Sequence, residues 1–210
     1  ISGLSSHFNI FLLISVSLAA ALKQDSNTIS NLSKSVSLFT IIIALCSYIT
    51  IPLGIPITLQ TLGVFLALEL LGGKKGTFSV LLYLLLGAVG VPVFSGFRGG
   101  IGVLLSNTGG YIVGFVLLAF IYWLITSLLG SKIYARILGM TLGLLACYFF
   151  GTLWFVIAYS DIKNMSEMIP VLQLCILPFI IPDIAKMFLS LGLRKLVYPA
   201  LPDNLKHPLL

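Results

Sequence analysis

Long apolar runs dominate this sequence and constrain its fold more than any single motif. Six such runs, separated by short glycine-, proline- or charge-rich segments, cover residues 36–53, 57–72, 77–92, 108–129, 136–159 and 168–198. About 20 consecutive apolar residues form a helix long enough to cross the roughly 30 Å hydrocarbon core of a bilayer. Only 9% of the residues are charged, whereas soluble domains contain about 25%. The sequence therefore predicts an all-α membrane protein with six transmembrane helices.

A shorter apolar run, residues 8–22, precedes these six. Its length of about 15 residues lies between that of a short span and that of a signal-peptide core. No basic residue precedes the run, so we interpret it as an additional N-terminal hydrophobic helix that spans the membrane or lies at its surface. The chain then divides into an N-terminal segment and polar linker (1–35), a membrane domain (36–198) and a C-terminal tail (199–210).

The basic residues predict the orientation of the membrane domain. Lys and Arg gather in the cytoplasmic segments of multi-pass proteins. If the linker is cytoplasmic, the exterior loops hold only Arg98 and Lys163, and the cytoplasmic segments hold Lys23, Lys34, Lys74, Lys75, Lys132, Arg136, Arg194, Lys195 and Lys206. We therefore expect a protein of the bacterial cytoplasmic membrane whose linker and C-terminus are cytoplasmic. Topology accounts for the net charge of +6, so we expect the lipid bilayer and no nucleic acid as a partner.

Several patterns that would indicate an enzyme are missing. The segment 72–76 (GGKKG) is a basic turn that lacks the spacing of a nucleotide-binding phosphate loop. Histidine occurs only near the two ends, at positions 7 and 207, and no pair of carboxylates is evident. Cys46, Cys147 and Cys175 are isolated and lack metal-ligand spacing. The sequence therefore predicts no catalytic residues, no metal site and no cofactor.

Two charged residues, Asp183 and Lys186, interrupt the last apolar run. An ionisable side chain in mid-membrane costs about 2.5–3.5 kcal/mol on insertion scales, so it usually has a specific role. The spacing of three residues places both on one helix face. Pro178 and Pro182, just before Asp183, can break the hydrogen-bond ladder of the helix and free carbonyls toward a cavity. The pair either binds a polar ligand or forms a structural ion pair inside the bundle.

The segment between the third and fourth predicted spans, residues 90–111, contains many glycines, with Arg98 as its one charged residue. Glycine permits close approach of the backbone to a ligand, and the Arg98 guanidinium suits a carboxylate. The segment is either a lid-like or re-entrant loop over a pocket, or an exterior connector whose arginine contacts lipid phosphate.

Several motifs, in this order, resemble the BioY family, the biotin-specific S components of energy-coupling-factor (ECF) transporters. They are Ile55-Pro56-Ile-Thr-Leu-Gln60, Gly87-Ala-Val-Gly90-Val-Pro92, Arg98-Gly99-Gly100, Thr108-Gly109-Gly110-Tyr111, and Pro178-Phe179 through Asp183-Ile-Ala-Lys186. The resemblance covers residues 36–198, although Ile181-Pro182 stands where the family has Pro-Gly. It implies a six-helix S-component bundle that captures biotin from the exterior. Such a subunit docks on an ECF transmembrane scaffold driven by two ATP-binding subunits.

The resemblance also implies a set of substrate-binding residues. Biotin has a planar ureido ring, an apolar thiophane ring and a carboxylate tail. Asp183 would accept from a ureido N–H, Lys186 would donate to the ureido oxygen, and Arg98 would bind the carboxylate. Further polar candidates are Gln60, Asn107, Tyr83 and Tyr111. Alternatives remain for these four: Gln60 as a bridge between helices, the tyrosines in an interfacial belt, and Asn107 as a helix cap.

A second functional surface is suggested by small residues on the first predicted span. They recur at helical spacing, at Ser37, Thr40, Ala44 and Ser47. Small residues let helices approach closely, so this stripe either docks on the scaffold or packs inside the bundle. Glu69, near the cytoplasmic end of its span, is expected to pair with Lys74 or Lys75. An alternative function is a stand-alone secondary transporter or channel with Asp183–Lys186 as its switch, although no internal repeat supports it.

Overall fold

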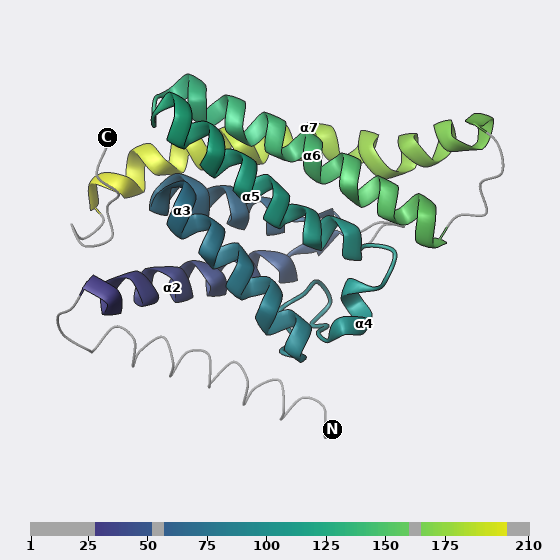
Figure 1. Cartoon of the computed structure of the whole chain (residues 1–210), viewed down its shortest axis with the longest axis horizontal. Coiled ribbons are helices and arrows are strands. Elements are labelled where there is room, and N and C mark those ends of the chain that lie inside the picture. Colours follow the sequence, from purple (N-terminus) through teal and green to yellow (C-terminus); the bar gives the residue numbers. More distant parts are fainter. Residues whose placement is uncertain (1–27, 52–56, 160–164, 201–210) are drawn as a thin grey trace.

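The computed structural model describes residues 28–51, 57–159 and 165–200, and these are mostly helical. The long helices run broadly along the longest axis of the molecule and pack side by side (Figure 1). The predicted N-terminal helix over residues 8–22 lies outside the described residues. The elements are α2 (Thr28–Tyr48), β1 (Thr50–Ile51), β2 (Ile57–Thr58), α3 (Gln60–Val89), α4 (Ile101–Leu104), α5 (Gly109–Leu129), α6 (Ile133–Tyr159), α7 (Met165–Val197) and the 3-10 helix η1 (Tyr198–Ala200).

The element α3 consists of two helices, because the chain reverses at Gly72. This residue has φ 80° and ψ 168°, which is outside the helical region, and glycine adopts such a positive φ without strain. Gln60 donates a hydrogen bond to Tyr83 at the far ends of the two halves, and an added Cβ at Gly76 would lie only 2.8 Å from Leu68 Cα near the turn. The halves are therefore antiparallel, as the separate apolar runs 57–72 and 77–92 predict.

A short antiparallel β-hairpin joins α2 to α3, and the sequence did not predict it. Thr50 pairs with Thr58, and Ile51 with Ile57. The apolar run was expected to stay helical to residue 53, but α2 ends at Tyr48. Thr50 and Ile51 are β-branched and come directly before a proline, and both features favour extended backbone. The hairpin brings Thr58 to the inside of the bundle.

Helices α5 and α6 pack closely along glycine residues. An added Cβ at Gly114 would lie 2.9 Å from Cys147 Sγ, and one at Gly143 would lie 2.7 Å from the carbonyl oxygen of Leu118. No larger side chain fits at either position without movement of the helices. Small residues permit this kind of close contact between membrane helices, and the contact fixes the frame on which the interior is built.

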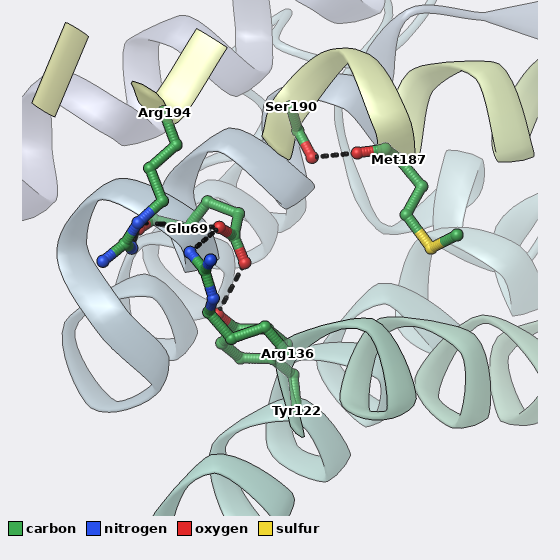
Figure 2. Close-up of polar contacts among 6 residues, drawn as sticks. All are labelled: Glu69, Tyr122, Arg136, Met187, Ser190 and Arg194. Atoms are coloured by element: carbon green, nitrogen blue, oxygen red, sulfur yellow. Dashed lines mark hydrogen bonds and ion pairs between the residues drawn. The ribbon is translucent and has the colours of Figure 1, made fainter. Parts of the chain in front are cut away.

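One buried carboxylate, Glu69, contacts residues of three other helices (Figure 2). It lies on α3 just before the turn at Gly72. Arg136 of α6 contacts Glu69 Oε2 at 2.6 Å, and Tyr122 of α5 donates to Oε1 at 2.9 Å. Arg194 of α7 donates to the Glu69 backbone carbonyl and lies 3.9 Å from Oε2. The expected pairing of Glu69 with a neighbouring lysine is therefore wrong, because the carboxylate points into the bundle, where it is 0% exposed.

The exterior of the described bundle is apolar. Three helical segments in the described ranges are long and apolar enough to cross a membrane: Gly109–Leu129, Ile133–Ile157 and Ile176–Val197. Large apolar side chains such as Phe149, Ile157 and Ile181 are more than two thirds exposed. Apolar surface of this extent is suited to contact with lipid. The chain is a multi-pass membrane protein, and the count of six spans stays a prediction.

Candidate functional site

A cavity lies where the turn at residues 94–98 and α4 meet the helix bundle. Its polar lining comes from six separate parts of the fold, and its apolar lining from α5, α6, α7 and the turn. The polar residues are Thr58, Gln60, Ser95, Arg98, Thr108, Tyr111, Tyr148 and Asp183; the larger apolar ones are Phe94, Ile112, Phe115, Leu144 and Phe179. A mostly apolar cavity with a few convergent polar groups is typical of a small-molecule site.

Asp183 supplies the carboxylate of the cavity wall. Tyr148 Oη donates to Asp183 Oδ2 at 2.6 Å, and Lys186 Nζ donates to Oδ1 at 2.7 Å. Asp183 is only 3% exposed, and a buried carboxylate needs such partners. Each carboxylate oxygen can accept more than one hydrogen bond. The site can therefore accept a further N–H from a ligand while the ion pair stays intact.

Lys186 lies behind Asp183 and is absent from the cavity lining. Its ammonium group also donates to the Thr58 carbonyl at 2.7 Å, so it links α7 to the β-hairpin. An ammonium group has three donors, which leaves one N–H after these two bonds. The ion pair expected from the spacing of three residues is present, and its acidic member faces the cavity.

Helix α7 is continuous from Met165 to Val197, so Pro178 and Pro182 do not end it, and the release of carbonyls toward the cavity stays a prediction. Proline removes one backbone donor from a helix, but helices inside membranes tolerate it because neighbouring groups satisfy the freed carbonyls. The continuous helix holds Phe179 and Asp183 on the cavity side, four residues apart.

Gln60 and Tyr83 form a pair at the open ends of the α3 hairpin. Gln60 Nε2 donates to Tyr83 Oη at 2.9 Å, and Tyr83 Oη donates to the Val93 carbonyl at 3.2 Å. Gln60 lines the cavity, whereas Tyr83 does not. Tyr83 is 1% exposed, which is incompatible with a place in an interfacial belt. The structure therefore puts Gln60 on the cavity wall and Tyr83 behind it.

The start of α5 contributes Thr108 and Tyr111. Tyr111 lines the cavity and shares a hydrogen bond of 2.9 Å with Thr152 of α6. Asn107 is absent from the lining, and the N-cap position of α5 belongs to Thr108. The sequence suggested Asn107 either as a ligand contact or as a cap. Thr108 instead lines the cavity and holds the N-cap position, without a side-chain capping hydrogen bond, and a ligand contact of Asn107 stays a prediction.

Arg98 borders the cavity from the turn that follows Val93. The turn is closed by backbone hydrogen bonds between Phe94 and Arg98, of 2.9 and 3.3 Å. The Arg98 Nε donates to the Ser95 carbonyl at 3.1 Å, which orients the side chain and leaves the two Nη groups for another partner. The guanidinium is exposed, so a ligand carboxylate can reach it from outside the bundle.

Gly87 holds Phe94 in the cavity wall. An added Cβ at Gly87 would lie 2.0 Å from Phe94 Cζ, so the phenyl ring occupies the space that a side chain would take. The ring also meets Tyr83 edge to face, with centroids 5.5 Å apart. The Gly87 carbonyl accepts the Gly100 N–H at 2.6 Å. The glycine thus fixes both the turn and the aromatic wall.

Known proteins resemble this chain over most of its length. The BioY family model matches residues 22–203. A protein named "Probable biotin transporter BioY", from Pyrococcus horikoshii, is 40% identical over 158 residues, which cover 73% of this chain and 90% of that one. The chain belongs to the BioY family.

Two further relatives extend the comparison. The "Biotin transporter BioY" of Thermotoga maritima is 51% identical over 89 residues, covering 42% of this chain and 53% of the relative, so that match spans about half of its length. The crystal structure at 2.1 Å of the S-component for biotin from an ECF-type ABC transporter aligns with a TM-score of 0.69 and 27% identity. The alignment covers 82% of this chain and 94% of that one.

Four polar cavity residues of this BioY chain were missed by the sequence reasoning: Thr58, Ser95, Thr108 and Tyr148. Tyr148 carried a usable signal, because a tyrosine in the middle of an apolar span must find a partner for its hydroxyl group. Thr58 acts partly through its backbone carbonyl, which no side-chain pattern reveals.

The small-residue stripe of this BioY chain lies mostly inside the described bundle. Thr40 Oγ1 donates to the Ser79 carbonyl at 3.0 Å, and Ser47 Oγ donates to the Val93 carbonyl at 2.6 Å. Thr40, Ala44 and Ser47 are all 5% exposed or less, and Ser37 is half-buried. These contacts favour the internal-packing alternative, and docking of a scaffold on this stripe stays a prediction.

Proposed function

We propose that this chain is the biotin-binding S component of an ECF transporter, which captures biotin from the exterior for uptake. One observation carries the proposal. In a chain of the BioY family, the buried Asp183–Lys186 pair presents its carboxylate to an apolar cavity bordered by an exposed arginine. Biotin has a polar ureido ring, an apolar thiophane ring and an anionic tail, and these match the carboxylate, the apolar walls and the arginine in that order.

The cavity suggests a role for each part of biotin. Asp183 accepts from a ureido N–H, and Lys186 holds this carboxylate in place through its hydrogen bond of 2.7 Å to Oδ1. Phe94, Phe115 and Phe179 enclose the thiophane ring, and Arg98 binds the tail carboxylate. Because Lys186 lies behind Asp183, direct donation to the ureido oxygen requires a different rotamer. Gln60 and Tyr111 lie on the wall and serve as further polar contacts.

The proposed topology places Arg98 at the exterior and the Gly72 turn at the cytoplasmic surface. The second half of α3 separates them by about 25 Å, at 1.5 Å per residue. Described basic residues gather at the Gly72 end: Lys74, Lys75, Lys132, Arg136, Arg194 and Lys195. This asymmetry supports a cytoplasmic placement for that end. The linker and the C-terminus then face the cytoplasm of a bacterial cell.

Energy for uptake would come from partners, namely a transmembrane scaffold and two ATP-binding subunits. The chain lacks a phosphate-loop motif of its own. The test is uptake of radiolabelled biotin by proteoliposomes that contain the chain with or without these subunits and ATP. Uptake that needs the partners supports the proposal. Proton-driven uptake by the chain alone would instead establish a secondary transporter.

The assignment of Arg98 has a test on the ligand side. Arg98→Gln should weaken biotin binding by about tenfold, which corresponds to one hydrogen bond to a charged group. Biotin methyl ester has no carboxylate and should bind both proteins equally. A similar loss for the acid and the ester would assign Arg98 to the turn and not to the ligand.

A further inference from the structure

A second, basic cavity lies at the Gly72 end of the bundle, far from the biotin site. Its lining includes Gly73 and Lys74 of the α3 turn, Ser127 and Ser131 around the end of α5, and Arg136 and Arg194 from α6 and α7. Its volume is about 410 Å³. None of its lining residues lines the biotin cavity.

The charges of this cavity are unbalanced. Lys74, Arg136 and Arg194 line it, and Glu69 is the one carboxylate that the described structure places against them. The three basic side chains and the one carboxylate together give this cavity a formal net charge of +2. Figure 2 shows Arg136 and Arg194 converging on Glu69, which holds both arginines in place. Lys74 is exposed and forms no ion pair with a carboxylate among the described residues.

Arg136 also carries an unmet hydrogen-bond donor. Its Nη1 contacts Glu69 Oε2, but its Nε is buried and has no acceptor among the described residues. A buried donor without an acceptor destabilises the fold. An anionic oxygen that entered the cavity would find the Lys74 ammonium and the hydroxyl groups of Ser127 and Ser131 in its lining, beside the Arg136 side chain. These are the partners that bind a phosphate group.

The surroundings indicate where such a phosphate would come from. The cavity lies at the ends of membrane-spanning helices, where lipid headgroups are found. Leu128 and Leu196, close in sequence to its lining residues, are 73% and 75% exposed, so acyl chains have an apolar surface beside it. Trp123 lines the cavity, and tryptophan is enriched at the headgroup level. Basic pockets between membrane helices on the cytoplasmic side bind anionic headgroups.

We propose that this cavity is a binding site for the phosphate-bearing headgroup of an anionic phospholipid. The bound lipid would close the Gly72 turn of α3 and the cytoplasmic ends of α5, α6 and α7 around Glu69. The proposal requires that this end lies at the membrane surface, and it does not depend on biotin as the transported molecule.

Native mass spectrometry of the purified chain tests the proposal. Phosphatidylglycerol and phosphatidylcholine with the same acyl chains are compared on the wild type, Lys74→Ala and Lys75→Ala. Lys75 is the matched control, because it neighbours Lys74 but does not line the cavity. We expect one phosphatidylglycerol to be retained selectively, with affinity about fivefold lower in Lys74→Ala, the contribution of one lysine near the surface. Lys75→Ala should bind as the wild type does.

Four results would overturn the proposal. Equal retention of the two lipids, or an equal loss in the two lysine variants, would show a nonspecific surface charge. Thermal stabilisation by inorganic phosphate at matched ionic strength, without selective retention of phosphatidylglycerol, would identify a site for free phosphate. Loss of scaffold co-purification in Lys74→Ala, without lipid selectivity, would assign the cavity to an acidic side chain of that partner.

Discussion

Replacement of Lys186 by methionine separates the structural from the ligand-binding role of the buried ion pair. Methionine keeps a long unbranched side chain but removes the two hydrogen bonds of 2.7 Å to Asp183 Oδ1 and the Thr58 carbonyl. Asp183 is 3% and Lys186 6% exposed, so water does not replace the lost donor. Removal of one partner from a buried pair costs about 3–5 kcal/mol. Because Tyr148 still donates to Asp183, we expect a loss of about 3 kcal/mol.

The double variant Asp183→Asn/Lys186→Met removes both charges and so removes the unpaired one. Its stability should return to within about 1 kcal/mol of the wild type. Biotin binding should remain at least about tenfold weaker, because a neutral amide oxygen accepts a weaker hydrogen bond than a carboxylate does. Recovered stability without recovered affinity would separate the two roles of the pair.

The assay is unfolding of the purified protein in mixed micelles with increasing sodium dodecyl sulfate, followed by the fluorescence of its two tryptophans. Biotin binding is measured on the same samples. Lys132→Met is the matched control, since Lys132 is exposed and outside both cavities. The reasoning is refuted if Lys186→Met costs less than about 1 kcal/mol. It also fails if the double variant binds biotin as tightly as the wild type.

Three further changes test other parts of the structure. Glu69→Gln should lower the free energy of unfolding by about 3–5 kcal/mol, because it leaves the largely buried Arg136 guanidinium without its counter-charge. Glu69→Leu combined with Arg136→Leu should recover most of this loss. If the double variant instead loses the sum of the two single losses, the ion-pair account is contradicted. Gly87→Ala should displace the Phe94 ring and cost about 1–3 kcal/mol, with weaker biotin binding, whereas unchanged affinity would show that the ring does not shape the site. Tyr148→Phe should destabilise the apo protein by about 1.5–3 kcal/mol, measured by the same unfolding titration, and an unchanged midpoint would remove Tyr148 from the Asp183 network.

Much of the bundle follows from the apolar runs, because each long run must become a helix to satisfy its backbone in lipid. The reversal at Gly72 follows from the glycine-rich basic turn that separates two such runs. The β-hairpin did not follow, since no charged residue or glycine separates Thr50 and Ile51 from the apolar helix before them. The continuity of α7 through two prolines did not follow either. It depends on packing against other helices, and the helix propensities of single residues do not include that packing.

Site residues were predictable where a charged side chain stands in an otherwise apolar run of the sequence. Asp183 and Lys186 are charges in an apolar run, so their importance could be predicted from position alone. Their partners could not, since Tyr148 and Thr58 lie far away in the sequence. Glu69 shows the same limit: sequence proximity favoured Lys74 or Lys75, but the carboxylate binds Arg136, 67 residues further on. Helix packing decides which distant residues pair, and these pairs cannot be predicted from one sequence.

The most direct test of the central claim is equilibrium binding of biotin to the purified, detergent-solubilised chain, with thiamine and riboflavin measured beside it. The account predicts tight, saturable binding of biotin at one site, little or no binding of the other two vitamins, and strong weakening in Asp183→Asn. A folded sample that binds none of the three, or that binds thiamine or riboflavin in preference, would contradict the assignment of this cavity to biotin.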